Sequence, residues 1–231
     1  MITLDPQTVL DLPLDELALR ILEDLARTRE WNEHNYLNTA SQDPLYSRSV
    51  PAQRAIAEAL SWLRGRAFIA CTPGHSTDSA IFVTRSGEQA LTGGLERTRA
   101  VQRLRTGLHP IIESKARRQF LLGEYEQAVF ASMKAIEIRI RQLAGFGNEL
   151  ISVDLINQAF GPKGVLTDTT AVKGEQEGTR AMFAGAYAVL RNPSGHRDVD
   201  YDDVSEAAEA VVTASLLMRI LDRVEARVET G

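Results

Sequence analysis

Helical periodicity dominates the chain from Leu95 to its C-terminus. The longest amphipathic segment begins near Glu124, and its apolar side chains recur three and four positions apart as far as Leu143. Further helical segments are "SVDLINQAFG", "EQEGTRAMFAGAYAVLR" and a final run that opens between Asp200 and Ser205, whereas "ELISV" is the one ambiguous run with strand character. Four or five helices with short connections bury their apolar sides against one another, which predicts a helical bundle over residues 96–231.

The N-terminal part of the chain begins with two helical periods. The segment "LPLDELALRILEDLAR" places Leu14, Leu17, Ile21 and Leu25 on one face, and "PAQRAIAEALSWLRG" has a similar apolar face. A polar segment from Asn32 to Ser49 joins the two, and we expect it to be a loop.

Two strands are expected to follow these helices. "AFIACTP" and "AIFVTRSG" are rich in β-branched and aromatic residues and flank the turn-forming "GHSTDS", which predicts a hairpin. Helix, polar connection, helix and hairpin is the order of a winged-helix module, which this part of the chain resembles. The sequence therefore predicts a mainly α protein, with a small α+β winged-helix-like domain at residues 1–95 and a helical bundle at 96–231 that starts with a basic connector at 96–120.

Charge is distributed unevenly along the chain. The net charge of −5 argues against a surface coated for unselective nucleic-acid binding, yet residues 96–120 carry seven Arg or Lys against two Asp or Glu. A winged helix that reads DNA is expected to carry Arg or Lys on its second main helix and wing. This helix offers only Arg54, Arg64 and Arg66, and the module is net acidic. Docking of a protein partner or structural support is therefore favoured over DNA recognition for the N-terminal domain.

The cellular location follows from cysteine usage and hydropathy. The single cysteine, Cys71, excludes an internal disulfide framework and fits a reducing cytoplasm. No segment reaches the roughly 18 uninterrupted apolar residues of a membrane span, and the N-terminus lacks the pattern of a secretory signal. We expect a soluble, cytoplasmic protein.

Several common chemistries have no sequence support. The chain has no phosphate-binding loop, no dinucleotide fingerprint, no H-E-x-x-H and no G-x-S-x-G. Cys71 and His75 lie in or beside the predicted hairpin turn, which gives a thiol nucleophile no structured base. The acidic "RDVDYDD" precedes a helix, where capping is the expected role of Asp. We expect no metal and no cofactor.

The stretch "RNPSGH" remains as a candidate for chemistry. Arg191 is always charged and can grip a phosphate with two parallel hydrogen bonds, and His196 can give and take a proton near neutral pH. This pair suits RNA cleavage, because RNA supplies its own nucleophile in the 2′-hydroxyl. The catalyst removes that proton, neutralises charge on phosphorus and protonates the leaving oxygen.

Spacing alone does not single out this pair. Arg27 and Arg29 precede His34, and Arg103 precedes His109, at similar separations. The context of "RNPSGH" differs, because it ends one amphipathic helix, contains Asn-Pro and Gly, and leads into the last helix of the predicted bundle. The alternative interpretation is an ordinary helix stop, with Arg at the negative end of the helix dipole and His on the surface.

An all-helical C-terminal domain with R-N-x-x-x-H before its last helix resembles the HEPN superfamily. The surrounding "GLHP", "LLGEYEQAVFASMKAIEIRIRQL" and "RNPSGH" are similar to a bacterial HEPN family of conserved hypothetical proteins, the Ymh type, which also has a winged-helix-like N-terminal part. The resemblance implies a metal-independent endoribonuclease of phage defence, abortive infection or a toxin–antitoxin system. It implies a homodimer formed through the bundle, in which two Arg–His pairs share one cleft.

The resemblance also implies a role for each residue. Arg191 would hold the scissile phosphate, His196 would act as general base or acid, and Asn192 would position the pair. The basic band would guide RNA to the cleft through Arg97, Arg103, Arg105, Arg117 and Arg118, although a solvated helix face also explains such charges. The alternative function is a non-catalytic nucleic-acid-binding regulator or adaptor that works through the winged helix and dimerises through the bundle.

Overall fold

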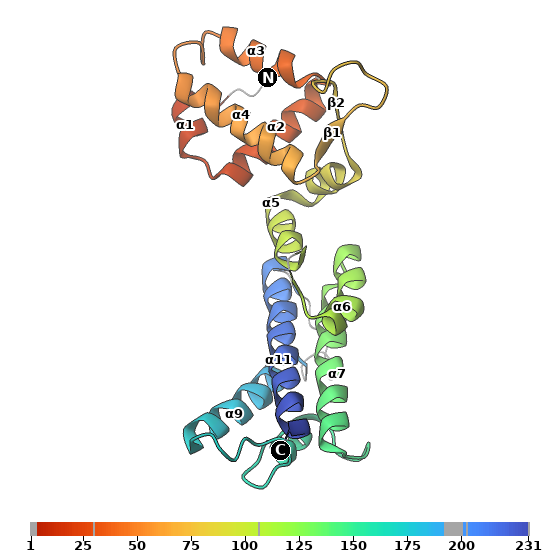
Figure 1. Ribbon diagram of the computed structural model, residues 1–231. Coiled ribbons are helices and arrows are strands. Elements are labelled where there is room, and N and C mark those ends of the chain that lie inside the picture. Colours follow the sequence, from red (N-terminus) through yellow and green to blue (C-terminus); the bar gives the residue numbers. More distant parts are fainter. Residues whose placement is uncertain (1–3, 30, 106, 192–200, 202, 231) are drawn as a thin grey trace. The chain divides into compact units, whose positions relative to one another are not determined.

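The computed structural model describes residues 4–29, 31–105, 107–191, 201 and 203–230 (Figure 1). The chain divides into two compact units, residues 1–98 and residues 99–231, which we call the N-terminal and C-terminal units. The described residues are mainly helical with one two-stranded sheet, which confirms the predicted mainly α class. No described helix is long and apolar enough to cross a membrane.

The N-terminal unit contains four helices and a hairpin within its described residues. They are α1 (Pro6–Asp11), α2 (Leu14–Thr28), α3 (Glu33–Gln42), α4 (Val50–Gly65), β1 (Ile69–Cys71) and β2 (Ile81–Val83). Helix α5 (Arg85–Arg105) starts in this unit, has non-helical backbone at Gly94 and ends in the C-terminal unit. The apolar faces of α2 and α4 pack against each other in one buried cluster.

One residue of the predicted apolar face of α2 is exposed. Leu17, Ile21 and Leu25 are fully buried, but Leu14 is 42% exposed because it is the first residue of α2. The equivalent prediction for α4 is confirmed, since Ile56 and the other apolar residues of its face are buried.

The predicted loop between Asn32 and Ser49 is wrong, because α3 occupies most of it. The Asn32 side chain caps this helix by accepting a hydrogen bond from the Asn35 N–H at 3.0 Å. Only Tyr36 and Ala40 of α3 are buried, and one i, i+4 pair leaves little apolar period in the sequence.

The predicted hairpin is confirmed, and a third segment joins it. Strands β1 and β2 pair antiparallel, with Ala70 opposite Phe82. Asn32 forms an antiparallel bridge with Ala80, and the Ile81 N–H donates to the Trp31 carbonyl at 2.9 Å. A short stretch before α3 therefore extends the sheet on the β2 side.

The C-terminal unit is all-helical in its described residues. After the end of α5 come α6 (Pro110–Leu122), α7 (Tyr125–Ala144), α8 (Ser152–Ala159), α9 (Lys173–Leu190) and α11 (Val204–Thr230). The ambiguous "ELISV" forms no strand; its Ser152 begins α8 instead. Asp203 accepts a hydrogen bond from the Ser205 N–H at the start of α11, the capping role expected for that part of the acidic run.

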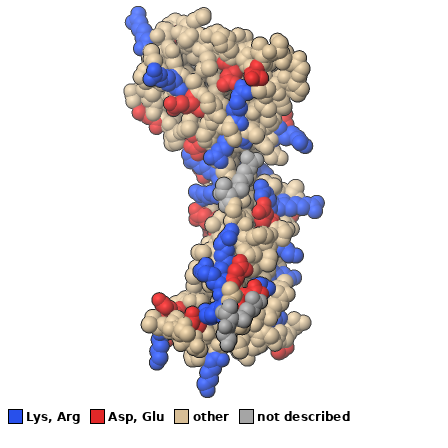
Figure 2. Space-filling model, in the orientation of Figure 1, with Lys and Arg blue, Asp and Glu red and all other residues tan. Residues whose placement is uncertain are grey.

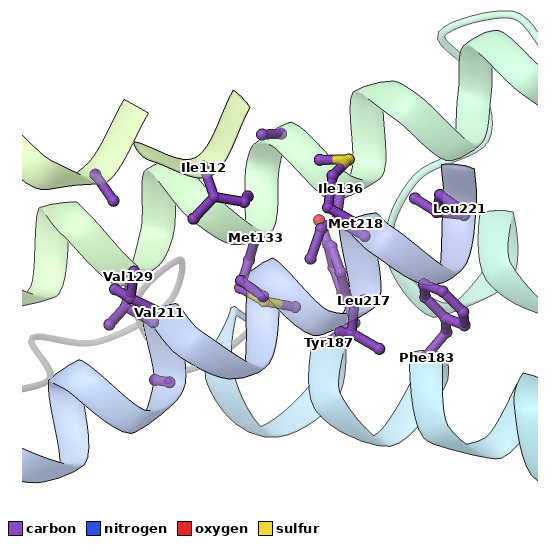
Figure 3. Packing of buried hydrophobic residues seen from close by; sticks show 14 of the residues in the cluster. Ile112, Val129, Met133, Ile136, Phe183, Tyr187, Val211, Leu217, Met218 and Leu221 are labelled. Atoms are coloured by element: carbon purple, nitrogen blue, oxygen red, sulfur yellow. The ribbon is translucent and has the colours of Figure 1, made fainter. Parts of the chain in front are cut away.

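A continuous apolar core joins the long helices of the C-terminal unit. Figure 3 shows Met133 and Ile136 of α7 in one core with Met218 of α11, and Phe183 and Tyr187 of α9 on another side of this core. Each of these side chains is at most 1% exposed. Because a buried apolar side chain contributes about 1.5–3 kcal/mol, this core fixes the end of α9 on α7 and α11.

Candidate functional site

Arg191 lies directly after α9 on the helix face that points inward. Phe183 and Tyr187 face the core of the C-terminal unit, and Arg191 follows at the same spacing of four residues. Its N–H donates to the Tyr187 carbonyl at 3.0 Å, so the backbone of Arg191 continues the last turn. The helix period therefore carries this arginine into the body of the unit rather than into solvent.

The guanidinium group of Arg191 lies near two aromatic rings. Its central carbon lies 4.3 Å from the centre of the Phe130 ring on α7 and 5.9 Å from that of Tyr187. The Nε atom is buried and has no hydrogen-bond partner within the described chain. Stacking on Phe130 orients the planar guanidinium group, an arrangement in which an arginine can bind an anion.

A carboxylate lies close to this arginine but is held by other groups. Glu137 of α7 accepts hydrogen bonds from the Tyr187 hydroxyl on one oxygen and from Arg141 Nη2, at 2.6 Å, on the other. Arg141 also donates to the Leu150 carbonyl at 2.9 Å. Tyr187, Glu137 and Arg141 therefore form a connected polar network beneath Arg191.

The network keeps its charges fixed at neutral pH. Burial opposes ionisation of Glu137, but the hydrogen bonds from Tyr187 and Arg141 outweigh it, and the pKa of the carboxyl is lowered. The positive charge of Arg191 acts in the same direction. Burial, together with the hydrogen bond to Glu137, raises the pKa of Tyr187, which therefore remains a neutral donor.

Tyr201 is a partly buried tyrosine shortly before α11. Burial raises the pKa of its hydroxyl, and the charges of Glu206 and of Glu126 on α7 add to this. Tyr201 packs against the apolar core of the C-terminal unit. Asn192 and His196 fall outside the described residues, so the geometry of the predicted pair stays a prediction.

The rival pair Arg103 and His109 has structural roles. His109 is 7% exposed, and its Nδ1 accepts the Ile111 N–H at 3.2 Å at the start of α6. Its Nε2 lies 3.0 Å from Asp222 Oδ2, and Arg103 pairs with Glu209 at 2.9 Å. Both side chains therefore hold elements of the C-terminal unit together.

The rivals around His34 are also accounted for within the N-terminal unit. His34 Nε2 lies 2.9 Å from the side-chain nitrogen of Asn38, one turn along α3. Arg27 pairs with the buried Asp24, and Arg29 ends α2 in the left-handed conformation. Arg27 is therefore engaged by Asp24, and His34 by Asn38.

The basic band is not a single stripe of available cations. Arg103 pairs with Glu209 and Arg117 with Glu113, whereas Arg118 is exposed on α6. Arg97 belongs to the N-terminal unit, and the Arg105 side chain is outside the described part of the structure. On the face shown in Figure 2, basic and acidic side chains are intermixed.

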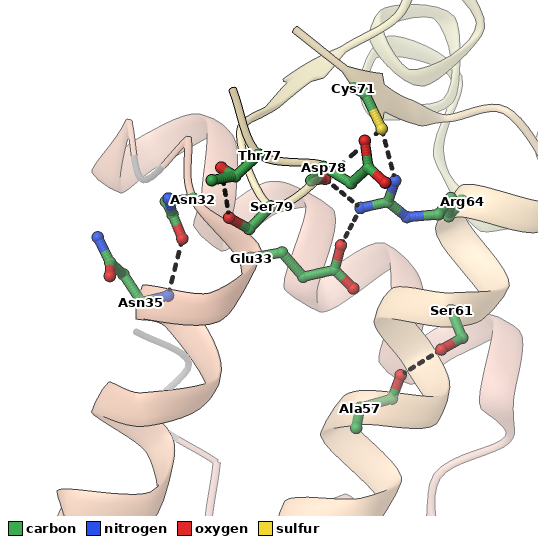
Figure 4. Close-up of polar contacts among 10 residues, drawn as sticks. All are labelled: Asn32, Glu33, Asn35, Ala57, Ser61, Arg64, Cys71, Thr77, Asp78 and Ser79. Carbon is green, nitrogen blue, oxygen red and sulfur yellow. Dashed lines mark hydrogen bonds and ion pairs between the residues drawn. The ribbon is translucent and has the colours of Figure 1, made fainter. Parts of the chain in front are cut away.

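Cys71 has an arginine partner rather than a histidine. Arg64 Nη1 lies 2.9 Å from the Cys71 sulfur, and the same guanidinium pairs with Glu33 and donates to the Asp78 carbonyl at 3.2 Å (Figure 4). Arg64 thus ties α4 to α3 and the hairpin, which withdraws one of the three arginines considered for DNA contact. In the described ranges, no group of His, Cys, Asp and Glu side chains is placed to hold a metal ion.

Sequence reasoning missed the three residues that support Arg191. Phe130 reads as one more apolar position of α7, and Glu137 with Arg141 reads as an ordinary i, i+4 surface pair. The one signal was the spacing of four between Tyr187 and Arg191, which puts both on one face of α9.

The C-terminal half of the chain matches a known family. A family model described as "Protein of unknown function (Hypoth_ymh)" matches residues 106–221. The chain belongs to this family. The match spans α6 to α11 and includes Arg191 and the helices that hold it. The Hypoth_ymh description assigns no activity, and no curated protein and no solved structure matches the chain.

Proposed function

We propose that this Hypoth_ymh protein is a HEPN-type endoribonuclease that cleaves RNA without a metal ion, with Arg191 and His196 as its catalytic residues. The observation that carries the proposal is the state of Arg191. Its guanidinium is stacked on Phe130, and its Nε is buried without a partner in the described chain. A desolvated and oriented cation of this kind binds a phosphate more strongly than one in water.

The polar network beneath the arginine supports the same role. Glu137 lowers the cost of burying the positive charge, yet both of its oxygens already accept hydrogen bonds from Tyr187 and Arg141. Glu137 therefore partly balances the charge of Arg191, and the Nε of Arg191 is still without a partner in the described chain.

In the proposed reaction, the 2′-hydroxyl attacks the adjacent phosphorus and the 5′-oxygen leaves. His196 takes the hydroxyl proton or protonates the leaving oxygen, and Arg191 stabilises the charge on the phosphate oxygens. Asn192 would orient the pair. The products are a 2′,3′-cyclic phosphate and a free 5′-hydroxyl.

Further parts of the proposal rest on the HEPN resemblance. They are a cytoplasmic role as an effector of phage defence, abortive infection or a toxin system, homodimerisation through the C-terminal unit, and guidance of RNA by the basic band. Within that band, the exposed Arg118 has the clearest access to RNA. Its replacement by Ala should weaken RNA binding and reduce the salt dependence without changing cleavage at saturating RNA.

An adaptor that works through the winged helix is the second candidate, and the strand arrangement around Trp31 and β2 favours it. Its exposed recognition face is poorly suited to DNA, because the exposed Arg54 stands one turn from Glu58 and Arg64 is bound to Glu33. A protein partner fits this unit better than DNA.

RNA cleavage in EDTA separates the two candidates. The wild-type protein should produce 2′,3′-cyclic ends, and Arg191→Ala or His196→Ala should lower the rate by at least about a hundredfold. Arg223→Ala and His75→Ala change an exposed Arg and an exposed His and should leave the rate unchanged. Intact RNA with wild-type protein, together with a shifted DNA duplex, would overturn the ribonuclease proposal.

Toxicity gives a second test that needs no chosen RNA. Expression of the wild-type chain should slow growth, and His196→Ala should relieve this effect while His75→Ala does not. Equal toxicity of all three proteins would contradict a role for His196.

A further inference from the structure

A cleft lies between the first half of α9, the segment that follows α8 and the last turns of α11. It consists of two adjoining hollows of about 580 Å³ and 200 Å³, which share the lining residues Phe160, Thr167 and Gln176. Clefts of this size hold small organic molecules in many proteins. None of the lining residues is assigned a role in RNA cleavage. The cleft is therefore a separate candidate site.

The larger hollow has an apolar floor. Phe160, Leu166 and Val224 are each at most 4% exposed, and Ile220 also lines the hollow. The Phe160 ring stacks on Phe183 of the core, with 4.9 Å between the ring centres. The floor is therefore part of the packed core, and it offers a ligand an apolar surface that is already formed.

The charged side chains around the larger hollow balance one another. Arg227 Nη1 lies 3.1 Å from Asp168 Oδ2, and Arg227 Nη2 donates to the Leu166 carbonyl at 2.7 Å. Glu175 and Arg223, which carry opposite charges, are exposed at the rim. The larger hollow therefore carries no net charge and suits the uncharged part of a ligand.

The smaller hollow contains two cations without a carboxylate partner in the described chain. Lys173 and Arg180 line it and are two turns apart on α9. Arg180 is half-buried, and within the described residues its side chain has one partner, the neutral Asn157, with 3.5 Å between Arg180 Nη1 and Asn157 Oδ1. Glu177 also lines this hollow, but it forms no ion pair with either cation in the part of the chain that the structure describes. A guanidinium group held in a cleft by a neutral amide can bind a carboxylate through two parallel hydrogen bonds.

We propose that the cleft binds a small carboxylate with an apolar body. Arg180 and Lys173 bind the carboxylate in the smaller hollow, and the body lies on the floor of the larger one. Gln176, which donates to the Ala171 carbonyl at 2.9 Å, stands where the two hollows meet. The negative charge of Glu177 disfavours a second charge on the ligand, so a carboxylate fits better than a phosphate ester.

Matched ligands test the two parts of the cleft in isothermal titration calorimetry. Octanoate has both a carboxylate and an apolar body, whereas octanol lacks the charge and acetate lacks the body. The wild-type chain should bind octanoate at one site, and it should bind octanol and acetate at least tenfold more weakly. No binding of octanoate, or equal binding of octanol, would overturn the proposal, and tighter binding of octyl phosphate would contradict a carboxylate.

Two substitutions on α9 should change octanoate binding in opposite directions. Arg180→Gln should weaken it at least tenfold and leave octanol unaffected, because only the carboxylate needs the guanidinium group. Glu177→Gln removes a like charge beside the ligand at an exposed position and should strengthen binding several-fold. Lys134→Gln replaces a cation by an amide at an exposed position of α7 and should have no effect. Equal effects of Arg180→Gln and Lys134→Gln, or weaker binding by Glu177→Gln, would refute the assignment.

A bulky side chain in the larger hollow tests the place of the apolar body. Ala171→Phe fills this hollow and should weaken octanoate binding at least tenfold while circular dichroism shows an intact fold. Val172→Phe adds an aromatic ring at the next residue, which is 68% exposed and does not line the cleft, and should not change binding. Unchanged binding by Ala171→Phe would show that no ligand body lies on this floor.

Discussion

Tyr187→Phe removes one hydroxyl from the core of the C-terminal unit and leaves the ring in place. The tyrosine is 1% exposed, and the Glu137 side chain that accepts its hydrogen bond is 12% exposed. A hydrogen bond to a charged group in such surroundings contributes about 1.5–3 kcal/mol. Arg141 still donates to Glu137 in the variant, so we expect the lower part of that range, a loss of about 2 kcal/mol in unfolding free energy.

The loss should depend on pH in a defined way. The pKa of Glu137 is lowered in the folded chain, so its stabilising effect is complete above the unfolded value of about 4.3 and is lost as the pH falls through the folded pKa. The pKa of Tyr187 is raised, so wild-type protein loses stability above about pH 10, a loss that phenylalanine cannot show. The difference between the two proteins should therefore be largest near pH 7 and narrow at both extremes.

Urea denaturation with two probes measures this effect. Both tryptophans, Trp31 and Trp62, lie in the N-terminal unit, so their fluorescence serves as an internal control. Circular dichroism should show an earlier transition for the C-terminal unit, and tryptophan fluorescence should not change. Glu137→Gln completes a double-mutant cycle. A loss below about 0.5 kcal/mol, or additive effects of the two substitutions, would refute the network described here.

Three further predictions concern other side chains. Phe130→Leu keeps an apolar side chain but removes the aromatic ring beneath Arg191. Under the proposed function this change should slow RNA cleavage about tenfold while the circular dichroism spectrum stays unchanged, and an unaltered rate would mean that the stack does not position the arginine. Asn32→Ala removes the side-chain cap of α3 and should lower the free energy of unfolding by about 1 kcal/mol, measured by urea denaturation followed by tryptophan fluorescence. Asn38→Ala, the same change at a position of α3 that does not cap the helix, is the control. Gly123→Ala forces a side chain into the left-handed conformation at φ +85° after α6 and should cost about 1 kcal/mol by circular dichroism, whereas Gly65→Ala, at the end of α4, should be neutral or stabilising.

The sequence by itself determined the elements with a strong period. The apolar face of α4, the long α7 and the hairpin each repeat a pattern over enough residues for local rules to apply. Helix α3 was not predicted because it buries only Tyr36 and Ala40, and because its capping residue, Asn32, is also common in polar loops.

Part of the candidate site was also predictable from the sequence, and part was not. The sequence pointed to Arg191 by its context, but the spacing of Arg and His did not exclude the other Arg–His pairs, because it is similar in each of them. Only tertiary structure showed that His109 is bound by Asp222 and that Arg191 is stacked on Phe130 above Glu137. These partners come from helices distant in sequence, and their roles depend on burial, which a local pattern does not contain.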